Sequence, residues 1–168
     1  SALGPISLVL KEEPTPAHAL QTLCRYLQLV NPSLMLHVER AGELVILREE
    51  LLPSPGLQMR QSVELAVGTL YRLLSELAGP HWRAREVCLT HRPPQDLRAH
   101  RAFFGRSVKF NQAFNGLVCL TRDLEQPRSD SDRLAAGFAR QYLDAALRTQ
   151  AASAQAKIYP LILARSEE

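Results

Sequence analysis

The segment from Leu34 to Arg48 constrains the fold of this chain more than any other. Before a turn at Arg40-Ala41-Gly42, Leu34, Leu36 and Val38 alternate with Met35, His37 and Glu39, so the two sets point to opposite faces of a strand. After the turn, Leu44 and Ile46 alternate in the same way with Val45 and Leu47. A two-residue period on both sides of a turn is typical of a β-hairpin. Because four of the five residues from Leu44 to Arg48 are aliphatic, we expect the second strand to be covered on both faces.

Three segments have the apolar period of amphipathic helices. Thr15-Pro16 begins the first, and Asn31-Pro32 ends it. The second spans Met59 to Ala78, with an apolar stripe and a stop at Gly79-Pro80. The third spans Leu134 to about Leu147, and we expect its inner face to be Leu134, Phe138, Tyr142 and Ala145. The residues after Thr149 have the composition of a spacer, and the run from Ile158 to Leu163 is apolar again.

The stretch from Val87 to Leu120 combines short elements. A strand bearing Val87, Leu89 and His91 on one face ends at Pro93-Pro94, and a short helix runs from Asp96 to Phe104. A strand with Val108 and Phe110 follows. The dipeptide Asn115-Gly116 favours a tight turn, so we predict a hairpin there, leading into Leu117–Leu120.

These elements predict an α+β fold. A chain of 168 residues with 46% hydrophobic and 22% charged residues is long and apolar enough for one domain with a real core. About five strands, four or five helices and hairpins in place of strict strand–helix alternation indicate a single domain with a mostly antiparallel sheet. A doubly wound parallel sheet is the alternative.

Composition also limits where the chain acts. No apolar run approaches the roughly 20 residues of a membrane span, and the first five residues do not resemble a secretion signal. The three cysteines, Cys24, Cys88 and Cys119, are odd in number and lie in apolar surroundings. We expect them to be reduced, as in a cytoplasmic protein without membrane contact.

Motifs for catalysis are not found. The chain has no Gly-rich phosphate loop, no nucleophile elbow and no histidines at metal-ligand spacing, so we expect no enzyme activity, no cofactor and no metal. His91 stands out because it continues an apolar strand face: it is either a satisfied core or strand-end histidine or a polar group at a pocket mouth. The basic residues between Arg83 and Lys109 either form a solvated face or attract phosphate or an acidic partner.

Several of these segments together resemble a known family. The matching residues are Leu3-Gly4-Pro5, Pro14-Thr15, Ala19-Leu20, Gln61, Val63-Glu64-Leu65-Ala66, Val87 to Pro93, Phe103-Phe104-Gly105, Val108, Phe110, Phe114 to Cys119, Asp123-Leu124, Pro127 and Asp132 to Leu143. Over residues 3–148 they resemble the arabinose-binding-like effector domain of AraC/XylS transcriptional regulators, in the branch of the ornithine-responsive regulators. The resemblance implies that Ile6 to Leu10 is helical.

The resemblance also implies a domain organisation and a function. Residues 1–149 would be an effector-sensing regulatory domain without the family's usual helices before Leu3, and residues 150–168 a linker toward a helix-turn-helix domain that is absent here. Such domains bind a small-molecule effector and form homodimers, and DNA would be bound through the missing part. An effector-independent dimerisation module is the alternative, and a small enzyme is a third possibility.

We place the effector pocket between the sheet and the helix Met59–Ala78. Five polar or aromatic side chains are the expected ligand-binding residues: His37, Tyr71, His91, Asn111 and Phe114. The basic region from Arg98 to Lys109 is an alternative contact for an anionic ligand. The sequence does not identify the effector.

Overall fold

A five-stranded sheet forms the centre of the molecule. The computed structural model describes residues 4–53, 56, 58–128 and 133–165. The strands are β1 (Leu34–Ala41), β2 (Leu44–Leu51), β3 (Glu86–Cys88), β4 (Val108–Lys109) and β5 (Asn115–Leu120), in the order β1-β2-β5-β3-β4. Every neighbouring pair is antiparallel except β3 and β4, which are parallel. The predicted α+β fold with a mostly antiparallel sheet is confirmed.

Helices precede, interrupt and follow the sheet. They are α1 (Pro5–Glu12), α2 (Pro16–Val30), α3 (Met59–Ala78), α4 (Arg98–Phe104), α5 (Thr121–Leu124) and α6 (Arg133–Arg165), with a short 3-10 helix at Gly105–Ser107. The Thr15 hydroxyl caps α2 by accepting from the His18 backbone N–H, as the sequence predicts. Helix α3 has the predicted bounds and ends at Gly79, whose φ of 98° favours glycine. None of the helices in the described ranges is long and apolar enough to cross a bilayer.

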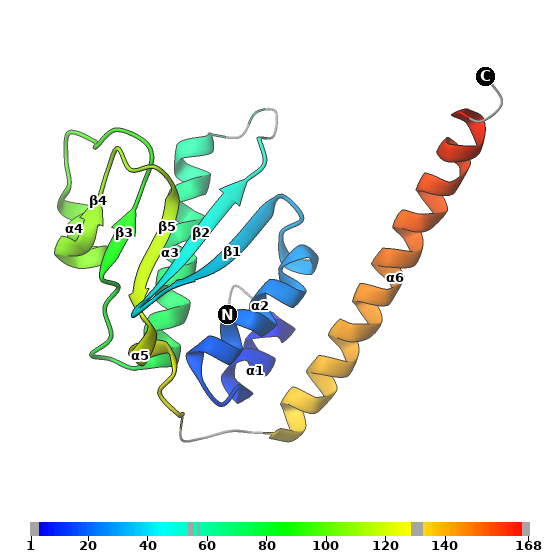
Figure 1. Cartoon of the computed structure of the whole chain (residues 1–168), viewed down its shortest axis with the longest axis horizontal. Helices are drawn as coiled ribbons and strands as arrows, with labels where there is room; N and C mark the ends of the chain where they lie inside the picture. The colour runs from blue at the N-terminus through cyan, green and yellow to red at the C-terminus, as the bar shows by residue number, and fades with distance from the viewer. Residues whose placement is uncertain (1–3, 54–55, 57, 129–132, 166–168) are drawn as a thin grey trace.

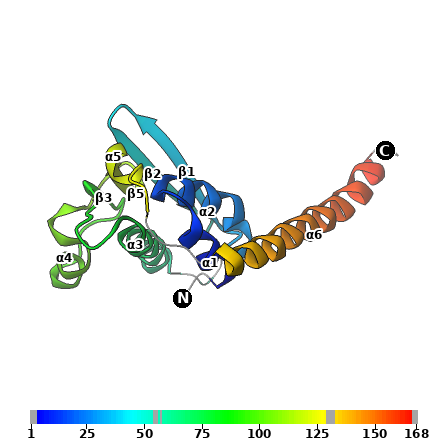
Figure 2. The same ribbon diagram turned by 90° about the horizontal axis from the view of Figure 1, so that it is seen from below.

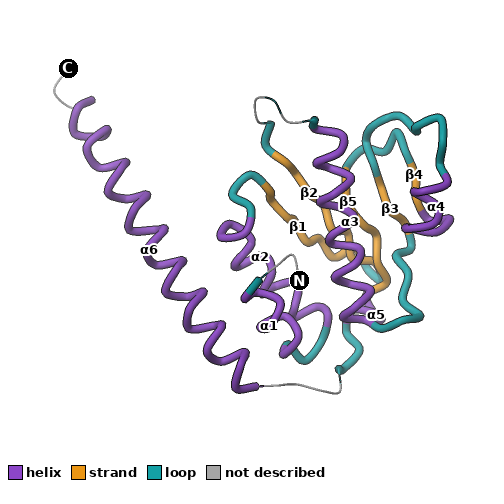
Figure 3. Tube along the Cα trace, turned by 180° about the vertical axis from the view of Figure 1, so that it is seen from behind, coloured by secondary structure: helices purple, strands orange, loops and turns teal. Residues whose placement is uncertain are grey.

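The core lies between the sheet and the helices on one of its faces. Helix α3 runs across that face, and α2 lies along β1 beside it (Figures 1 and 3). Buried residues of α3, among them Val67, Leu70 and Leu74, belong to the same cluster as Leu47 of β2 and Leu117 of β5. Cys88 and Cys119 are buried, and all three cysteines are free.

The predicted turn at Asn115-Gly116 is wrong. Both residues begin β5, where Gly116 pairs with Arg48 of β2. Gly116 has a φ of 150°, and a Cβ atom there would overlap the Leu47 carbonyl oxygen. Glycine is therefore required by the close approach of two strands rather than by a turn.

The predicted inner face of the last helix is also wrong. Helix α6 buries Ala136, Ala139 and Leu143, whereas Phe138 and Tyr142 are 73% and 66% exposed. Ala145 is also exposed, and the side chain of Leu134, the fourth predicted residue, lies outside the described residues. Small alanine side chains let α6 approach α1 closely, which the aromatic residues would prevent. The expected spacer after Thr149 is a continuation of the same helix.

Polar contacts hold the first part of α6 against α1 and α2. The Tyr26 hydroxyl donates to Asp144 Oδ1 at 2.6 Å, and Arg140 Nη2 lies 2.6 Å from Glu13 Oε1. Beyond these contacts α6 extends away from the rest of the molecule, as Figures 1 and 2 show. Of the residues expected as a linker, 150–165 are thus the projecting end of one long helix.

Candidate functional site

A cavity of about 470 Å³ lies between α2, the strands β1 and β2, and α3. This volume is within the range of small-molecule pockets. Its lining is mostly aliphatic, with a few polar side chains: Leu23, Leu27, Val30 and Asn31 from α2 and its end, Ser33, Leu34, Leu36, Glu49, Leu51 and Leu52 from β1, β2 and their flanks, and Ser62, Leu65, Ala66, Thr69, Leu70 and Leu73 from α3. The cavity lies where the sequence places a pocket, between the sheet and α3.

Glu49 is the ionisable side chain of this lining. It pairs in register with Leu36 of β1 and Asn115 of β5, so it shares the sheet face that α2 and α3 cover. The residue is 7% exposed, and its Oε2 atom is buried without a hydrogen-bond partner. Burial raises the pKa of Glu49 to about 8. An unpaired carboxyl group therefore faces an apolar cavity.

The cavity opens to solvent past apolar side chains. Val30, Leu52 and Leu65 line it and are 40%, 50% and 72% exposed, so they form its rim. Exposed leucines around an opening are typical of a surface that contacts an apolar molecule. The geometry suits a ligand with a hydrocarbon body.

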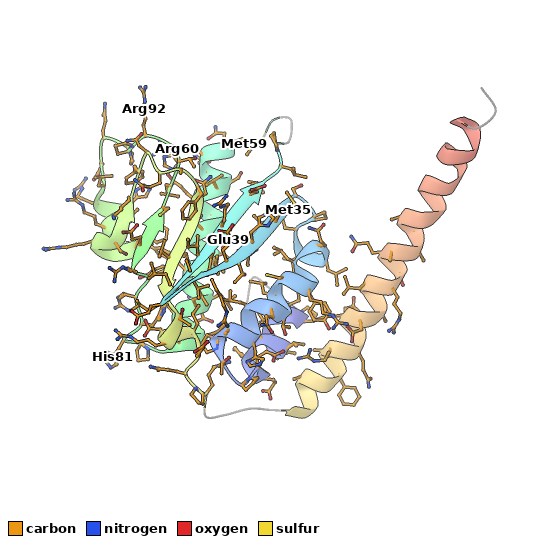
Figure 4. All side chains as sticks on the ribbon, in the orientation of Figure 1. Met35, Glu39, Met59, Arg60, His81 and Arg92 are labelled. Atoms are coloured by element: carbon orange, nitrogen blue, oxygen red, sulfur yellow. The ribbon has the colours of Figure 1, made fainter. Side chains whose placement is uncertain are left out.

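A second carboxylate, Glu64, lies on another side of α3 among three cationic or potentially cationic groups. Its Oε1 atom is 3.0 Å from His91 Nε2, 3.2 Å from His100 Nε2 and 3.2 Å from Arg60 Nε. The Phe110 ring packs against both imidazoles, with centroids 5.5 Å from His91 and 5.4 Å from His100. Arg60 at the start of α3 and Arg92 in the loop after β3 lie at the same end of the molecule (Figure 4). This Glu64 cluster joins α3 to the β3–α4 loop and to α4.

The charge balance of the cluster differs from that of the cavity. Burial alone would raise the pKa of Glu64, but hydrogen bonds from Arg60 and His100, together with the nearby charges of His100 and His91, hold it below its usual value. His91 Nδ1 donates to the Arg92 carbonyl at 2.9 Å, because a carbonyl oxygen can only accept. Among the residues the structure describes, no group of three or more His, Cys, Asp or Glu is arranged to hold a metal ion. The cluster is thus an Arg60–Glu64 ion pair with two imidazoles beside the same carboxylate oxygen, and His91 Nε2 and His100 Nδ1 are buried without a hydrogen-bond partner in the described part of the chain.

The expected ligand-binding residues lie in several places, and the cavity lining contains none of the five. His37 is exposed on β1. The guanidinium carbon of Arg48, on the neighbouring strand β2, lies 5.4 Å from the centroid of the Phe114 ring. Tyr71 is buried among Trp82, Phe103 and Phe104. These three residues are not brought together.

His91 and Asn111 do lie side by side. The Asn111 backbone N–H donates to the His91 carbonyl at 3.1 Å, and Asn111 adopts a positive φ of 56°. His91 belongs to the Glu64 cluster, which spans three segments of the chain. Sequence reasoning finds no carboxylate partner for His91 or His100 because Glu64 is distant in sequence and no regular spacing relates the three.

Glu49 is the functional candidate that the sequence does not reveal. It occurs in the run Arg48-Glu49-Glu50, which has the appearance of a solvated strand end. The strand period offers one signal, because Glu49 continues the inward set of Val45 and Leu47, both of them buried. A charged residue in an inward position is a mark of a functional site.

Comparison with known proteins gives consistent matches. The family described as the N-terminal arabinose-binding domain of AraC transcription regulators matches residues 1–128. The chain is 26% identical over 144 residues to the HTH-type transcriptional regulator VirS of Mycobacterium tuberculosis, in strains CDC 1551 / Oshkosh and ATCC 25618 / H37Rv, covering 84% of this chain and 42% of that protein. The crystal structure of the transcriptional regulator CdpR from Pseudomonas aeruginosa has the same fold, with a TM-score of 0.68 at 19% identity, covering 82% of this chain and 45% of that one.

The chain thus spans less than half the length of these relatives. Both relatives are named as transcriptional regulators, and the family match covers most of the 168 residues. The chain belongs to the arabinose-binding domain family found at the N-terminus of AraC transcription regulators.

Proposed function

We propose that this chain is the effector-sensing domain of an AraC-type transcriptional regulator and that the cavity between α2, β1, β2 and α3 binds the effector. The observation that carries the proposal is a mostly apolar cavity of about 470 Å³ with a buried carboxyl group facing it. Such a combination of apolar lining and few polar groups is typical of ligand pockets. A transcriptional role and the three free cysteines support a cytoplasmic location.

A thermal-unfolding screen tests the proposal. Binding to the folded state raises stability, by about 2.7 kcal/mol when the ligand is at 100 times its Kd. We expect a member of a panel of amino acids, polyamines and fatty acids to raise the Tm of the native chain. The control is Ala66→Trp, which should fill the cavity and remove the response. A folded, full-length regulator that responds to no member of the panel would contradict an effector sensor.

We also propose that the domain forms a homodimer through α6. Phe138 and Tyr142, four residues apart, lie beside the stripe of α6 that buries Ala136 and Ala139 and are largely exposed. Paired exposed aromatics on a projecting helix suit a self-complementary contact, and two-fold dimers are the commonest oligomers. In the whole protein, DNA would be bound by a helix-turn-helix domain outside these 168 residues, with residues 1–149 as the sensor and 150–168 as the connection.

The mass of the protein in solution tests the dimer. Light scattering should give twice the 18.8 kDa of the chain for the native protein and the monomer mass for Phe138→Glu/Tyr142→Glu. Leu65→Glu, at the cavity rim, should remain dimeric. Loss of the dimer in Leu65→Glu alone would instead make the rim the interface and would favour an effector-independent dimerisation module.

A further inference from the structure

The carboxyl group of Glu49 is the least compensated polar group in the cavity. Its Oε2 atom is buried and accepts no hydrogen bond, and Glu49 faces Leu36 and Asn115 across the neighbouring strands. The Asn115 side-chain oxygen accepts from the Thr90 backbone N–H. A buried polar atom without a partner costs free energy, so a ligand that supplies the partner gains affinity.

Two hydroxyls of the lining, and the absence of basic side chains from it, favour a donor on the ligand. The hydroxyls of Ser62 and Thr69 donate to the carbonyls of Gln58 and Leu65, so each oxygen has only lone pairs left to offer. The lining residues include no lysine, arginine or histidine. The Asn31 side-chain oxygen accepts from the Ser33 backbone N–H, so the Asn31 amide N–H groups and the Ser33 hydroxyl are further polar groups of the lining, and neither carries a charge. A ligand carboxylate or phosphate would therefore enter without a cationic partner, whereas an ammonium group can pair with the Glu49 carboxylate.

We propose that the cavity binds a small amphiphilic amine, with a protonated nitrogen at Glu49 and a hydrocarbon body against the leucines of α2, β1 and α3. The inference rests on the proposed function and adds the chemical class of the effector. The apolar rim of Val30, Leu52 and Leu65 would contact the far end of the body.

Proton linkage gives the pairing a specific signature. Because burial raises the pKa of Glu49 to about 8, the free carboxyl group is mostly neutral at pH 7, and pairing with an ammonium group releases its proton. No other ionisable side chain is among the lining residues. The affinity for an amine should therefore rise about tenfold for each pH unit from 6 to 8 and level off above that.

Calorimetry with three probes of one chain length tests the inference: n-decylamine, n-decanol and decanoate. The native chain should bind decylamine at least tenfold more tightly than either of the others. Glu49→Gln should lose at least tenfold in decylamine affinity and keep its decanol affinity. The matched control is Glu50→Gln, which alters the next residue on the exposed side of β2 and should change neither.

The outcomes separate the ligand class from the site. If decanol or decanoate binds the native chain as tightly as decylamine, or if Glu49→Gln keeps full decylamine affinity, the proposal that the ligand is an amine is wrong. If Ala66→Trp then abolishes the binding that remains, the cavity is still the effector pocket. Binding of none of the three probes by the folded native chain would overturn both the amine and the pocket.

Discussion

Glu49 and Glu64 are both partly or wholly enclosed glutamates, yet their surroundings differ. Glu64 has an arginine and two histidines within 3.2 Å, and these groups hold its pKa below the usual value. Glu49 has no such partner, and burial raises its pKa to about 8. Side chains of the protein itself surround the Glu64 carboxylate, whereas we propose that a ligand supplies the partner of the Glu49 carboxyl group. The comparison contrasts a carboxylate that is paired within the protein with one that we propose binds a ligand.

Removing the charge at Glu49 should give the largest effect. The folded state holds the Glu49 proton more tightly than the unfolded chain, so stability falls as pH rises from the ordinary value of 4.5 to about 8. At about 1.4 kcal/mol per pKa unit the cost reaches roughly 5 kcal/mol at high pH. Glu49→Gln should therefore be more stable than the native chain by roughly that amount at pH 9 and by little at pH 4.5, as measured by urea unfolding. If the stability difference between the variant and the native chain is the same at both pH values, the account of Glu49 as a buried carboxyl group without a partner is wrong.

Deleting the ring that packs on the Glu64 cluster should have the next largest effect. Phe110 is partly buried against the core and contacts both His91 and His100. Phe110→Ala should cost about 3 kcal/mol, the lower end of the range for buried phenylalanines. Chemical unfolding at pH 7 measures this cost. A loss below about 1 kcal/mol would mean that the cluster does not depend on the ring.

Neutralising Glu64 should destabilise the protein moderately and in the opposite pH direction. Because its pKa is lowered on folding, the stabilisation is present above the unfolded pKa and is lost as pH falls through the folded value. Glu64→Gln should cost about 1–2 kcal/mol at pH 7 and less below pH 4. The control Arg60→Ala removes an exposed i,i+4 partner and should cost about 0.4 kcal/mol. If the Glu64→Gln variant is as stable as the native chain at pH 7, then Glu64, like Glu49, gains no stability from its charge.

Elements with a strong local pattern were predictable from the sequence. Helix α3 has an unbroken apolar stripe and a glycine stop, and the β1–β2 hairpin has a two-residue period, so both appear where expected. Helix α6 has an aromatic stripe beside an alanine stripe, and which of the two is buried depends on how α6 packs against α1. The local sequence pattern therefore does not predict the buried face. Gly116 shows the same limit: a turn and a close strand approach both require glycine, and only the pairing with β2 distinguishes them.

The candidate site was predictable in position but not in its residues. A pocket between the sheet and α3 follows from the order of elements, whereas its lining depends on how α2 packs beside α3. Glu49 becomes unusual only when those two helices cover its strand face. The Glu64 cluster needs α3, the β3–α4 loop and α4 to meet, and no sequence spacing encodes that contact.

The titration of the Glu49 carboxyl carbon, followed by ¹³C NMR with and without n-decylamine, tests the central claim most directly. The account predicts a midpoint near pH 8 in the free protein and a midpoint at least two pH units lower when the amine is bound. A free midpoint near 4.5, or a midpoint that decylamine does not move, would contradict it.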